Sequence, residues 1–488
     1  IQSREKMSIP TKKLDKYTWE IPATFNPNMR VPGRIYADEE LLEKMKVDRT
    51  LIQCINVAQL PGILKYSITL PDGHQGYGFP IGGVAAFDTD NGIVTPGGVG
   101  YDINCGVLLL RTDLTHNDIK PYLQELINRI FEAVPSGVGR GGLLRTSTSE
   151  LDRAVVEGVE WAIKKGFGWA EDNKHIEDEG CMENANPDKV SIKAKQRAAS
   201  QLGTLGAGNH FLEIARVAEI YDNQTAKIFG ITDVNQIVVW IHTGSRGYGH
   251  QIASDYIRVM DHAMGKYNIK VSDRELGCAP ISSREGEDYL EAMACAMNYG
   301  FLNRHIIMHR IREAFEKTLG KSADTMGMKL VYGMTHNTAK FEEHMVNGKR
   351  LKTLVHRKGA SRAFGPGRKE IPEDYRAIGQ PVLLVGTMGT ASYLLVGTDK
   401  GEEISFASTA HGAGRMLSRA GAKRQFNINE VINELKKRGI ILKAASREGV
   451  EEEVPESYKD INKVAKVSDE VGIGRKVMMS RPLAVTKG

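Results

Sequence analysis

The sequence has few cysteines and no long hydrophobic run. Its five cysteines are odd in number, widely spaced and form no CxxC pair. Neither a disulfide framework nor a zinc ribbon is indicated, and a reducing compartment is expected. Apolar runs such as Ile237–Ile241 are far shorter than the roughly 20 residues that span a bilayer, and the polar N-terminus lacks the apolar segment of a signal peptide. We therefore expect a soluble, cytoplasmic protein without a membrane segment, in which Ile1–Lys6, before Met7, are an extension or a cloning remnant.

The sequence also lacks a strong charge imbalance. Lys and Arg number 65 against 60 Asp and Glu, a net charge of +5, which fits a nucleic acid, a nucleotide or neither as partner. Hydrophobic residues make up 41% of the chain, which excludes disorder. Glycine is in excess, at 51 of 488 residues, and gathers in bursts such as 97–100 and 412–414. Such bursts indicate sharp turns or close approach of the backbone to a ligand.

Hydrophobic periodicity predicts both helices and strands. Helices are predicted over 123–134, 150–165, 251–264, 286–318 and 428–438, and strands over 66–70, 106–110, 237–241, 329–332 and 381–385. Strands and helices do not alternate regularly and no fixed repeat is present, so we predict an α+β fold. No linker divides the chain, so we expect one catalytic unit over 1–488, with the charged segment 168–195 as a solvated insertion.

Four glycine-flanked turns present metal-binding residue types. They supply one carboxylate, one thiolate and three imidazoles, from Asp102, Cys105, His210, His242 and His336. This set suffices for one or two divalent ions such as Mn²⁺, Zn²⁺ or Co²⁺, and a thiolate can bridge two of them. Each residue alone is more often structural, so the spacing by itself does not decide whether these residues bind a metal.

His305 and His309 have the i, i+4 spacing of a helical metal pair. The residue after His305 is Ile306, whereas an HExxH motif needs glutamate there. We expect both histidines to be structural.

The most specific sequence indication of phosphate chemistry is a histidine that could act as a nucleophile. His411 lies beside Gly412 and Gly414, with Arg415 four residues on, and an imidazole nitrogen can attack phosphorus if its other nitrogen is held by an acceptor. Asp72 is one candidate acceptor. The segment 386–392 follows a predicted strand and can offer anion donors. No Walker A sequence is present, and no GxGxxG follows a strand in a βαβ unit, so any nucleotide must be held in another way.

Several motifs together resemble the RtcB family of RNA ligases. They are PDGHQGYG (71–78), TPGGVGYDINCGV (95–107), QLGTLGAGNHFLE (201–213), HTGSRGYGHQ (242–251), HRKGASRAF (356–364), GQPVLLVGTMGTASY (379–393) and HGAGRMLSR (411–419). The likeness runs from near residue 15 to residue 488. It implies a single large domain with mixed and antiparallel sheets around a central metal cleft and helices outside.

The resemblance also implies the activity. The family uses GTP and Mn²⁺ to join RNA ending in a 2′,3′-cyclic phosphate or 3′-phosphate to RNA with a 5′-hydroxyl, through a guanylylated histidine and an RNA-3′-pp-G intermediate, as in tRNA splicing. Implied partners are tRNA exon halves, GTP and an archaease-like activator, and the protein is expected to be a monomer. The alternatives are a metal-dependent cyclic phosphodiesterase without ligation and a non-catalytic RNA-binding protein.

The resemblance assigns roles to individual residues. His411 matches the guanylylated histidine, and the five metal candidates match the ligands of two Mn²⁺ ions, bridged by Cys105. Guanylate contacts are implied for Asn209, His210, Phe211, Leu212, Glu213, His336, Asn337, Val385, Gly386, Thr387, Met388, Ser392, His411, Gly412, Ala413, Gly414, Tyr458 and Lys487. The Glu213 carboxylate can accept from guanine N1–H and N2–H₂, which adenine does not present.

Three arginines resemble RNA-phosphate positions of the family. Arg197, Arg246 and Arg419 suit phosphate pairing or could equally be surface ion pairs. Ala410 and Gly333 depart from residues that relatives often carry, cysteine and aspartate, without removing a proposed ligand.

Overall fold

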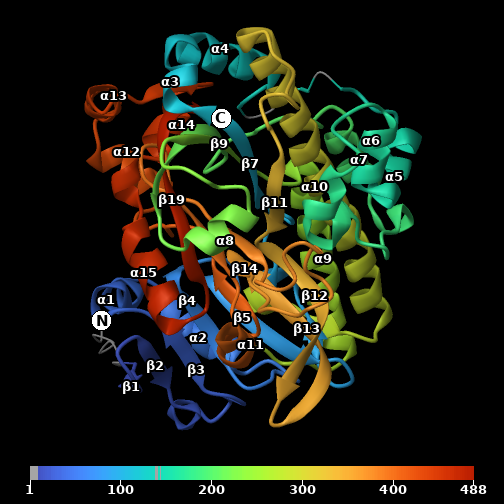
Figure 1. The fold of residues 1–488 in the computed structure, drawn as a ribbon. Coiled ribbons are helices and arrows are strands. Elements are labelled where there is room, and N and C mark those ends of the chain that lie inside the picture. Colours follow the sequence, from blue (N-terminus) through green and yellow to red (C-terminus); the bar gives the residue numbers. More distant parts are fainter. Residues whose placement is uncertain (1–8, 138–140, 143) are drawn as a thin grey trace.

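The computed structural model describes residues 9–137, 141–142 and 144–488. Within these ranges the strands form a seven-stranded sheet, an eight-stranded sheet and two two-stranded sheets, with helices packed around them (Figure 1). The predicted α+β fold is confirmed. Ile1–Lys6, for which an extension was expected, lie outside the described residues. Among the described helices, none is both long and apolar enough to cross a bilayer.

The eight-stranded sheet brings distant segments of the chain to one edge. Its order is β11 (Leu330–Thr335), β7 (Gly106–Thr115), β9 (Gln236–Thr243), β8 (Phe211–Ile220), β19 (Arg475–Lys487), β16 (Ser392–Val396) and β15 (Pro381–Leu384), and β18 (Ile441–Ala444) pairs with β19. Neighbours from β11 to β19 run antiparallel. The start of each strand therefore lies beside the end of the next.

The seven-stranded sheet carries the PDGH motif. Its order is β1 (Lys12–Lys13), β2 (Thr18–Ile21), β3 (Gly33–Tyr36), β4 (Ser67–His74), β5 (Ile81–Asp88), β13 (Lys349–Lys358) and β12 (Asn337–Val346). The small sheets pair β6 (Ile93–Val94) with β10 (Ala279–Pro280), and β14 (Ala360–Arg362) with β17 (Ser408–Ala410). Because β4 and β17 are in contact, the segment after β17 lies near the end of β4.

The helices follow the predicted pattern with one break. They are α1 (Glu39–Val47), α2 (Thr50–Val57), α3 (His116–Ile119), α4 (Leu123–Ala133), α5 (Thr148–Glu157), α6 (Val159–Lys164), α7 (Ile192–Ala198), α8 (Asn223–Ile228), α9 (Arg246–Lys266), α10 (Arg284–Leu319), α11 (Asp399–Ser405), α12 (Arg419–Gln425), α13 (Ile428–Lys437), α14 (Arg447–Glu452) and α15 (Ile461–Val471). The single helix predicted over 150–165 is wrong, because Gly158 has φ +61° and separates α5 from α6. A side chain at Gly158 would meet the carbonyl oxygen of Gly180 at 2.5 Å, so the break is built into the packing.

The eight-stranded sheet separates two hydrophobic cores. Along β7, Leu108 and Leu110 belong to one core and Val107 and Leu109 to the other, as the alternation of side chains in a strand requires. The first core is covered by α10, which contacts α4, α5, α6 and α9. These rigid surroundings fix the strand ends that carry the polar motifs.

The charged segment 168–195 is not simply a solvated insertion. Asp172 is 2% exposed and forms a two-bond ion pair with Arg312 of α10, at 2.7 and 2.9 Å. Glu177 is fully buried and pairs with Lys340 at 2.5 Å. The expectation is wrong for these acidic residues, because cations far away in the sequence reach them and compensate their burial.

Candidate metal and nucleotide site

Four strand ends place the predicted metal ligands together. Cys105 directly precedes β7, His210 directly precedes β8, His242 lies near the end of β9, and His336 directly follows β11. In the sheet register, His242 is opposite both Val107 of β7 and Phe211 of β8. The antiparallel order of these strands therefore explains why residues up to 231 positions apart meet at one edge.

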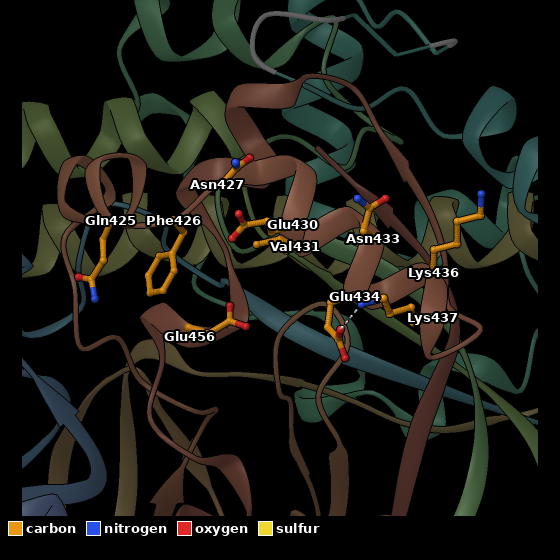
Figure 2. A pocket seen from close by; sticks show the side chains of 10 residues that line it. All are labelled: Gln425, Phe426, Asn427, Glu430, Val431, Asn433, Glu434, Lys436, Lys437 and Glu456. Carbon is orange, nitrogen blue, oxygen red and sulfur yellow. Dashed lines mark ion pairs between the residues drawn. The ribbon is translucent and has the colours of Figure 1, made fainter.

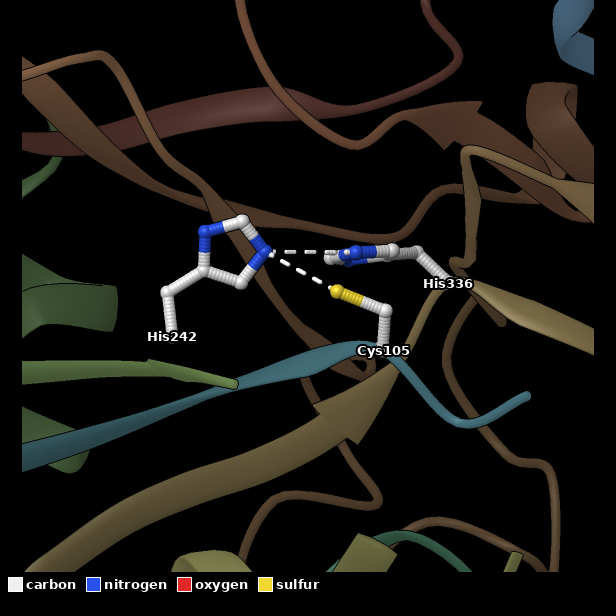
Figure 3. Close-up of side chains that lie close together, drawn as sticks. All are labelled: Cys105, His242 and His336. Atoms are coloured by element: carbon white, nitrogen blue, oxygen red, sulfur yellow. Dashed lines mark hydrogen bonds between the residues drawn. The ribbon is translucent and has the colours of Figure 1, made fainter. Parts of the chain in front are cut away.

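The ligand atoms form two groups that share one sulfur. Cys105 Sγ lies 3.4 Å from His210 Nε2 and 3.4 Å from His242 Nε2. On one side, His242 Nε2 lies 3.4 Å from His336 Nε2 (Figure 3). On the other side, His210 Nε2 lies 2.9 Å from Asp102 Oδ2. Within each group all ligand atoms lie within 4.8 Å of one another.

These separations fit donors around a common metal ion. With metal–ligand bonds of about 2.0–2.3 Å, donors at angles between 90° and tetrahedral lie roughly 2.8–3.8 Å apart. Asp102 Oδ1 is buried and makes no hydrogen bond to a described residue, as a carboxylate oxygen left for a cation would be. His210 Nδ1 lies 3.1 Å from the Leu205 carbonyl oxygen, which orients Nε2 toward the site. The residues present therefore fit one or two transition-metal ions.

Burial sets the protonation states of these donors. It lowers the pKa of His242 and of His336 well below the usual value, which keeps both imidazoles in the neutral form that binds metal. Burial, with the nearby Asp102 carboxylate, raises the pKa of the Cys105 thiol well above its usual value. A cation at the site would compensate the thiolate charge, because metal binding displaces the thiol proton.

His411 is anchored by Asp72 and lies against the metal donors. Its Nδ1 lies 2.5 Å from Asp72 Oδ2, which also accepts the backbone N–H of His411 at 3.1 Å. The rings of His411 and His336 have centroids 4.7 Å apart. Gly414 (φ +76°) lies so close to β4 that a side chain there would meet the Asp72 carbonyl oxygen at 2.2 Å. With Nδ1 donating to Asp72, Nε2 carries the free lone pair.

The first predicted guanylate segment lies beside the C-terminal strand. Residues Asn209 to Glu213 enter β8, which pairs with the end of β19. Lys487 Nζ donates to Asn209 Oδ1 at 3.3 Å and lies 5.8 Å above the Phe211 ring. Glu213 is 1% exposed, neither of its carboxylate oxygens has a hydrogen bond to a described residue, and burial raises its pKa well above the usual value. A buried acceptor without a partner is the feature expected of a site that recognises a donor-bearing ligand.

The second predicted segment lies beside His411. Val385 forms a bridge with Gly412, and its N–H donates to the His411 carbonyl oxygen at 3.4 Å. The Gly386 N–H donates to Ser392 Oγ at 3.2 Å, and the Thr387 N–H to Thr390 Oγ1 at 2.7 Å. This turn therefore runs directly alongside the histidine segment.

The remaining predicted guanylate contacts differ in what they can offer. Leu212 and Met388 are buried in the hydrophobic cores, so only their backbone groups can face a ligand. The Asn337 amide donates to the Asp102 carbonyl oxygen at 2.9 Å, and Ala413 is 4% exposed. The Tyr458 hydroxyl is held by Arg415 at 3.0 Å and by Glu453.

A comparison with known proteins decides the family. The family model described as tRNA-splicing ligase RtcB matches residues 53–488.

The chain belongs to the RtcB family.

Relatives match nearly the whole chain. A "tRNA-splicing ligase RtcB" of Pyrobaculum aerophilum is 54% identical over 483 residues, 99% of this chain and 100% of the relative. Proteins of the same name from Thermococcus kodakarensis and Nanoarchaeum equitans are 52% and 54% identical, over 98% and 99% of this chain and 99% and 100% of the relatives. The resemblance to the RtcB family is confirmed.

The structure of this RtcB-family chain adds supporting residues that sequence reasoning missed. Arg304 of α10 is 1% exposed and donates to the carbonyl oxygens of Asn104 and Thr243, each at 2.8 Å. It thereby ties the turn before β7 to the end of β9. Lys459 is buried and donates to the carbonyl oxygen of Gly73, next to Asp72. No local pattern marks either residue, because both act on segments distant in the sequence.

The helical histidine pair next to Arg304 is structural. His305 Nε2 lies 2.8 Å from the Phe167 carbonyl oxygen, and His309 Nδ1 accepts the Gly168 N–H at 3.1 Å. Both histidines therefore anchor the loop at 167–168, as expected.

The three arginines face different partners. Arg197 Nη1 donates to Gln251 Oε1 at 3.0 Å, and Arg246 Nε donates to Thr204 Oγ1 at 3.3 Å. Arg419 forms an ion pair with Glu453 at 3.0 Å. Arg197 and Arg246 thus have neutral partners, whereas Arg419 is already neutralised by a protein carboxylate.

A separate surface groove lies along two of the C-terminal helices. It has a volume of about 750 Å³ and follows the end of α12 and one side of α13 (Figure 2). Phe426 and Val431 supply its apolar lining, and Glu434 and Lys437 pair at its rim at 3.8 Å. None of its lining residues belongs to the predicted site, so it does not bear on the metal donors.

Proposed function

We propose that this chain is an RNA ligase of tRNA splicing that uses GTP to join a 2′,3′-cyclic phosphate or 3′-phosphate RNA end to a 5′-hydroxyl end. Full-length likeness to proteins named tRNA-splicing ligase supports the proposal. The observation that carries it is the arrangement of His411, whose Nδ1 is held by the buried Asp72 while its ring lies 4.7 Å from that of His336. Held in this way, His411 presents Nε2 with a free lone pair beside the metal donors, as a nucleophile for phosphorus requires.

We assign two Mn²⁺ ions to the two donor groups that share Cys105. Cys105, His242 and His336 would hold the ion next to His411, and Asp102, Cys105 and His210 the other. Bound there, divalent cations neutralise phosphate charge and orient the phosphates for in-line displacement.

His411 acts as the nucleophile of the first step. Its Nε2 attacks the α-phosphorus of GTP, an N–P bond forms, and the bond to the leaving pyrophosphate breaks. The imidazole becomes positively charged, and the Asp72 carboxylate stabilises that charge through Nδ1–H. Burial of Asp72 excludes water that would weaken this interaction.

The guanylate then activates the RNA end. An oxygen of the RNA 3′-phosphate attacks the guanylate phosphorus, and the N–P bond to His411 breaks, which yields the RNA-3′-pp-G intermediate. The 5′-hydroxyl oxygen attacks the 3′-phosphorus and its proton is released, a phosphodiester forms, and the phosphoanhydride bond breaks so that GMP leaves. A 2′,3′-cyclic phosphate is first opened by water to the 3′-phosphate.

Glu213 is the residue that distinguishes guanine. Burial favours the neutral form of its carboxyl group, and hydrogen bonds from guanine N1–H and N2–H₂ favour the ionised form, which accepts both. Its two oxygens have no other partner among the described residues. Lys487 and Phe211 lie beside it, and Val385 to Met388 with Gly412 to Gly414 flank the phosphate side. These contacts follow the guanylate positions of the RtcB family.

The partners follow from the same reaction. We propose GTP and the two tRNA exon halves as substrates, an archaease-like protein as activator, and a cytoplasmic monomer as the working form. Family membership supports these assignments.

The test is a ligation assay with defined RNA ends. A 5′-hydroxyl RNA and an RNA that ends in either a 3′-phosphate or a 2′,3′-cyclic phosphate are incubated with the protein, Mn²⁺ and either GTP or no nucleotide. Joined RNA that forms only with GTP supports the proposal. GTP-independent opening of the cyclic phosphate without joining would favour the phosphodiesterase alternative and refute ligation.

A further inference from the structure

Three aromatic rings lie next to Asp102, which belongs to the metal-donor group that does not contain His336, the neighbour of His411. Tyr101 is the residue before Asp102, its ring centroid lies 5.3 Å from that of Tyr77, and it stacks on His250 with centroids 5.0 Å apart. Tyr77 and Tyr101 are half-buried, and His250, in the first turns of α9, is exposed. Tyr77 lies in the loop after β4, Tyr101 lies in the turn before β7, and His250 lies in α9. The three rings therefore come from separate segments and do not form a local sequence motif.

This surface carries positive charge at its edge. Arg197 is exposed, and its guanidinium donates to Gln251, the neighbour of His250, at 3.0 Å. A side chain added at Gly247, one turn before His250, would lie 3.1 Å from Arg197 Nε. Aromatic rings next to a cation form the combination on which single-stranded RNA binds, because bases stack on the rings and phosphates pair with the cation.

The reaction geometry indicates which strand would bind there. His411 lies against His336, in one donor group, whereas Asp102 belongs to the other group. In an in-line displacement the attacking 5′-oxygen approaches from the side opposite the leaving GMP. The 5′-hydroxyl strand therefore approaches from the side of Asp102, next to Tyr101.

We propose that Tyr77, Tyr101 and His250 form a stacking platform for one of the first two bases of the 5′-hydroxyl RNA strand, beside the phosphate position that the family resemblance already assigns to Arg197. This inference rests on the proposed ligase function and adds a substrate subsite to it. The platform is tolerant of sequence, because every base presents a π-face.

The experiment is a binding measurement that does not require catalysis. Equilibrium binding of a labelled 5′-hydroxyl RNA hexamer to the Mn²⁺-loaded protein, without GTP, is compared with that of a hexamer whose first two nucleotides are abasic. Loss of the bases is expected to weaken binding to the wild-type protein about tenfold, the size of one base–aromatic stack. In Tyr101→Leu the two RNAs are expected to bind with nearly equal affinity, because the platform loses its central ring, the one that contacts both Tyr77 and His250.

Two variants separate stacking from structural damage. Tyr101→Trp retains a stacking face and is expected to restore the preference for the RNA with bases. Tyr122→Leu, which changes a tyrosine that is 43% exposed on another surface, is expected to behave as wild type. The inference is overturned if the abasic RNA binds the wild-type protein as well as the intact RNA, or if Tyr101→Leu keeps the full preference.

Failure of the subsite and failure of the proposed function have different signatures. The wild-type protein is assayed for ligation in parallel. Ligation with base-independent RNA binding would remove the platform and leave the ligase function intact. Base-dependent binding through Tyr101 without any ligation would leave the platform and refute the function.

Discussion

Replacing Asp72 by asparagine removes the negative charge that holds His411. The carboxylate is fully buried, and its Oδ2 lies 2.5 Å from His411 Nδ1 and 3.1 Å from the His411 backbone nitrogen. An amide has nearly the same volume but cannot compensate the positive imidazole that forms when Nε2 bonds to phosphorus. Breaking a buried charge pair costs about 3–5 kcal/mol. If that cost falls on the transition state, guanylylation slows by about 10²- to 10⁴-fold.

The assay is single-turnover formation of the protein–guanylate adduct from α-labelled GTP and Mn²⁺. The adduct is recognised as acid-labile and base-stable, as a phosphoramidate is. Asp90→Asn is the matched control, because Asp90 lies exposed in a turn, and it is expected to react at the wild-type rate. Thermal unfolding shows whether both variants are folded. An Asp72→Asn rate within about threefold of wild type would refute the role of the buried carboxylate.

Four further predictions follow from named contacts. Cys105→Ala removes the sulfur common to both donor groups and is expected to lose tightly bound metal at both positions. Metal analysis that finds two bound ions in this variant would contradict a sulfur ligand shared by both ions. Glu213→Ala is expected to reduce the preference for GTP over ATP in guanylylation by about tenfold or more, since hydrogen bonds to a charged group contribute about 1.5–3 kcal/mol each; an unchanged preference would assign recognition elsewhere. Asp172→Ala leaves the buried Arg312 without its partner and is expected to lower the free energy of unfolding by about 3–5 kcal/mol, measured by denaturant titration; a loss below about 1 kcal/mol would show that Arg312 is compensated differently. Burial alone would lower the pKa of His344, but acidic neighbours raise it above its usual value. The stability that protonated His344 contributes is therefore complete below a pH of about 6.5 and is lost as the pH rises through the raised pKa. The free energy of unfolding of His344→Gln is expected to depend less steeply on pH over that window, and equal slopes for variant and wild type would show that His344 is not the cause.

Much of the fold could be predicted from local patterns. The apolar periodicity of 123–134 and 286–318 corresponds to α4 and α10, and the run at 237–241 lies inside β9. The polar residues at the ends of these strands can be predicted as ligands because the apolar pattern of the strands shows where each strand ends. Their convergence depends on strand order, which puts β11, β7, β9 and β8 side by side and which no local pattern contains.

The features that sequence reasoning missed depend on distant partners. Arg304 lies in a long, mostly buried helix and carries no local signal of its role, yet it joins two site-bearing segments 61 or more positions away. The charge run around Asp172 predicts exposure to solvent, because the cation that compensates its burial is 140 residues farther on. In contrast, Asp72 could be named as a candidate acceptor for His411 because the chemistry of a phosphorus nucleophile requires one. The catalytic and binding roles of these residues stay predictions.

The most direct test of the account is to locate the nucleotide on the protein. After incubation with GTP and Mn²⁺, the protein is digested under alkaline conditions and its peptides are analysed by mass spectrometry. The account predicts a single GMP on the peptide that contains His411, absent from His411→Ala. A GMP on another residue, or an equal amount of adduct in His411→Ala, would contradict it.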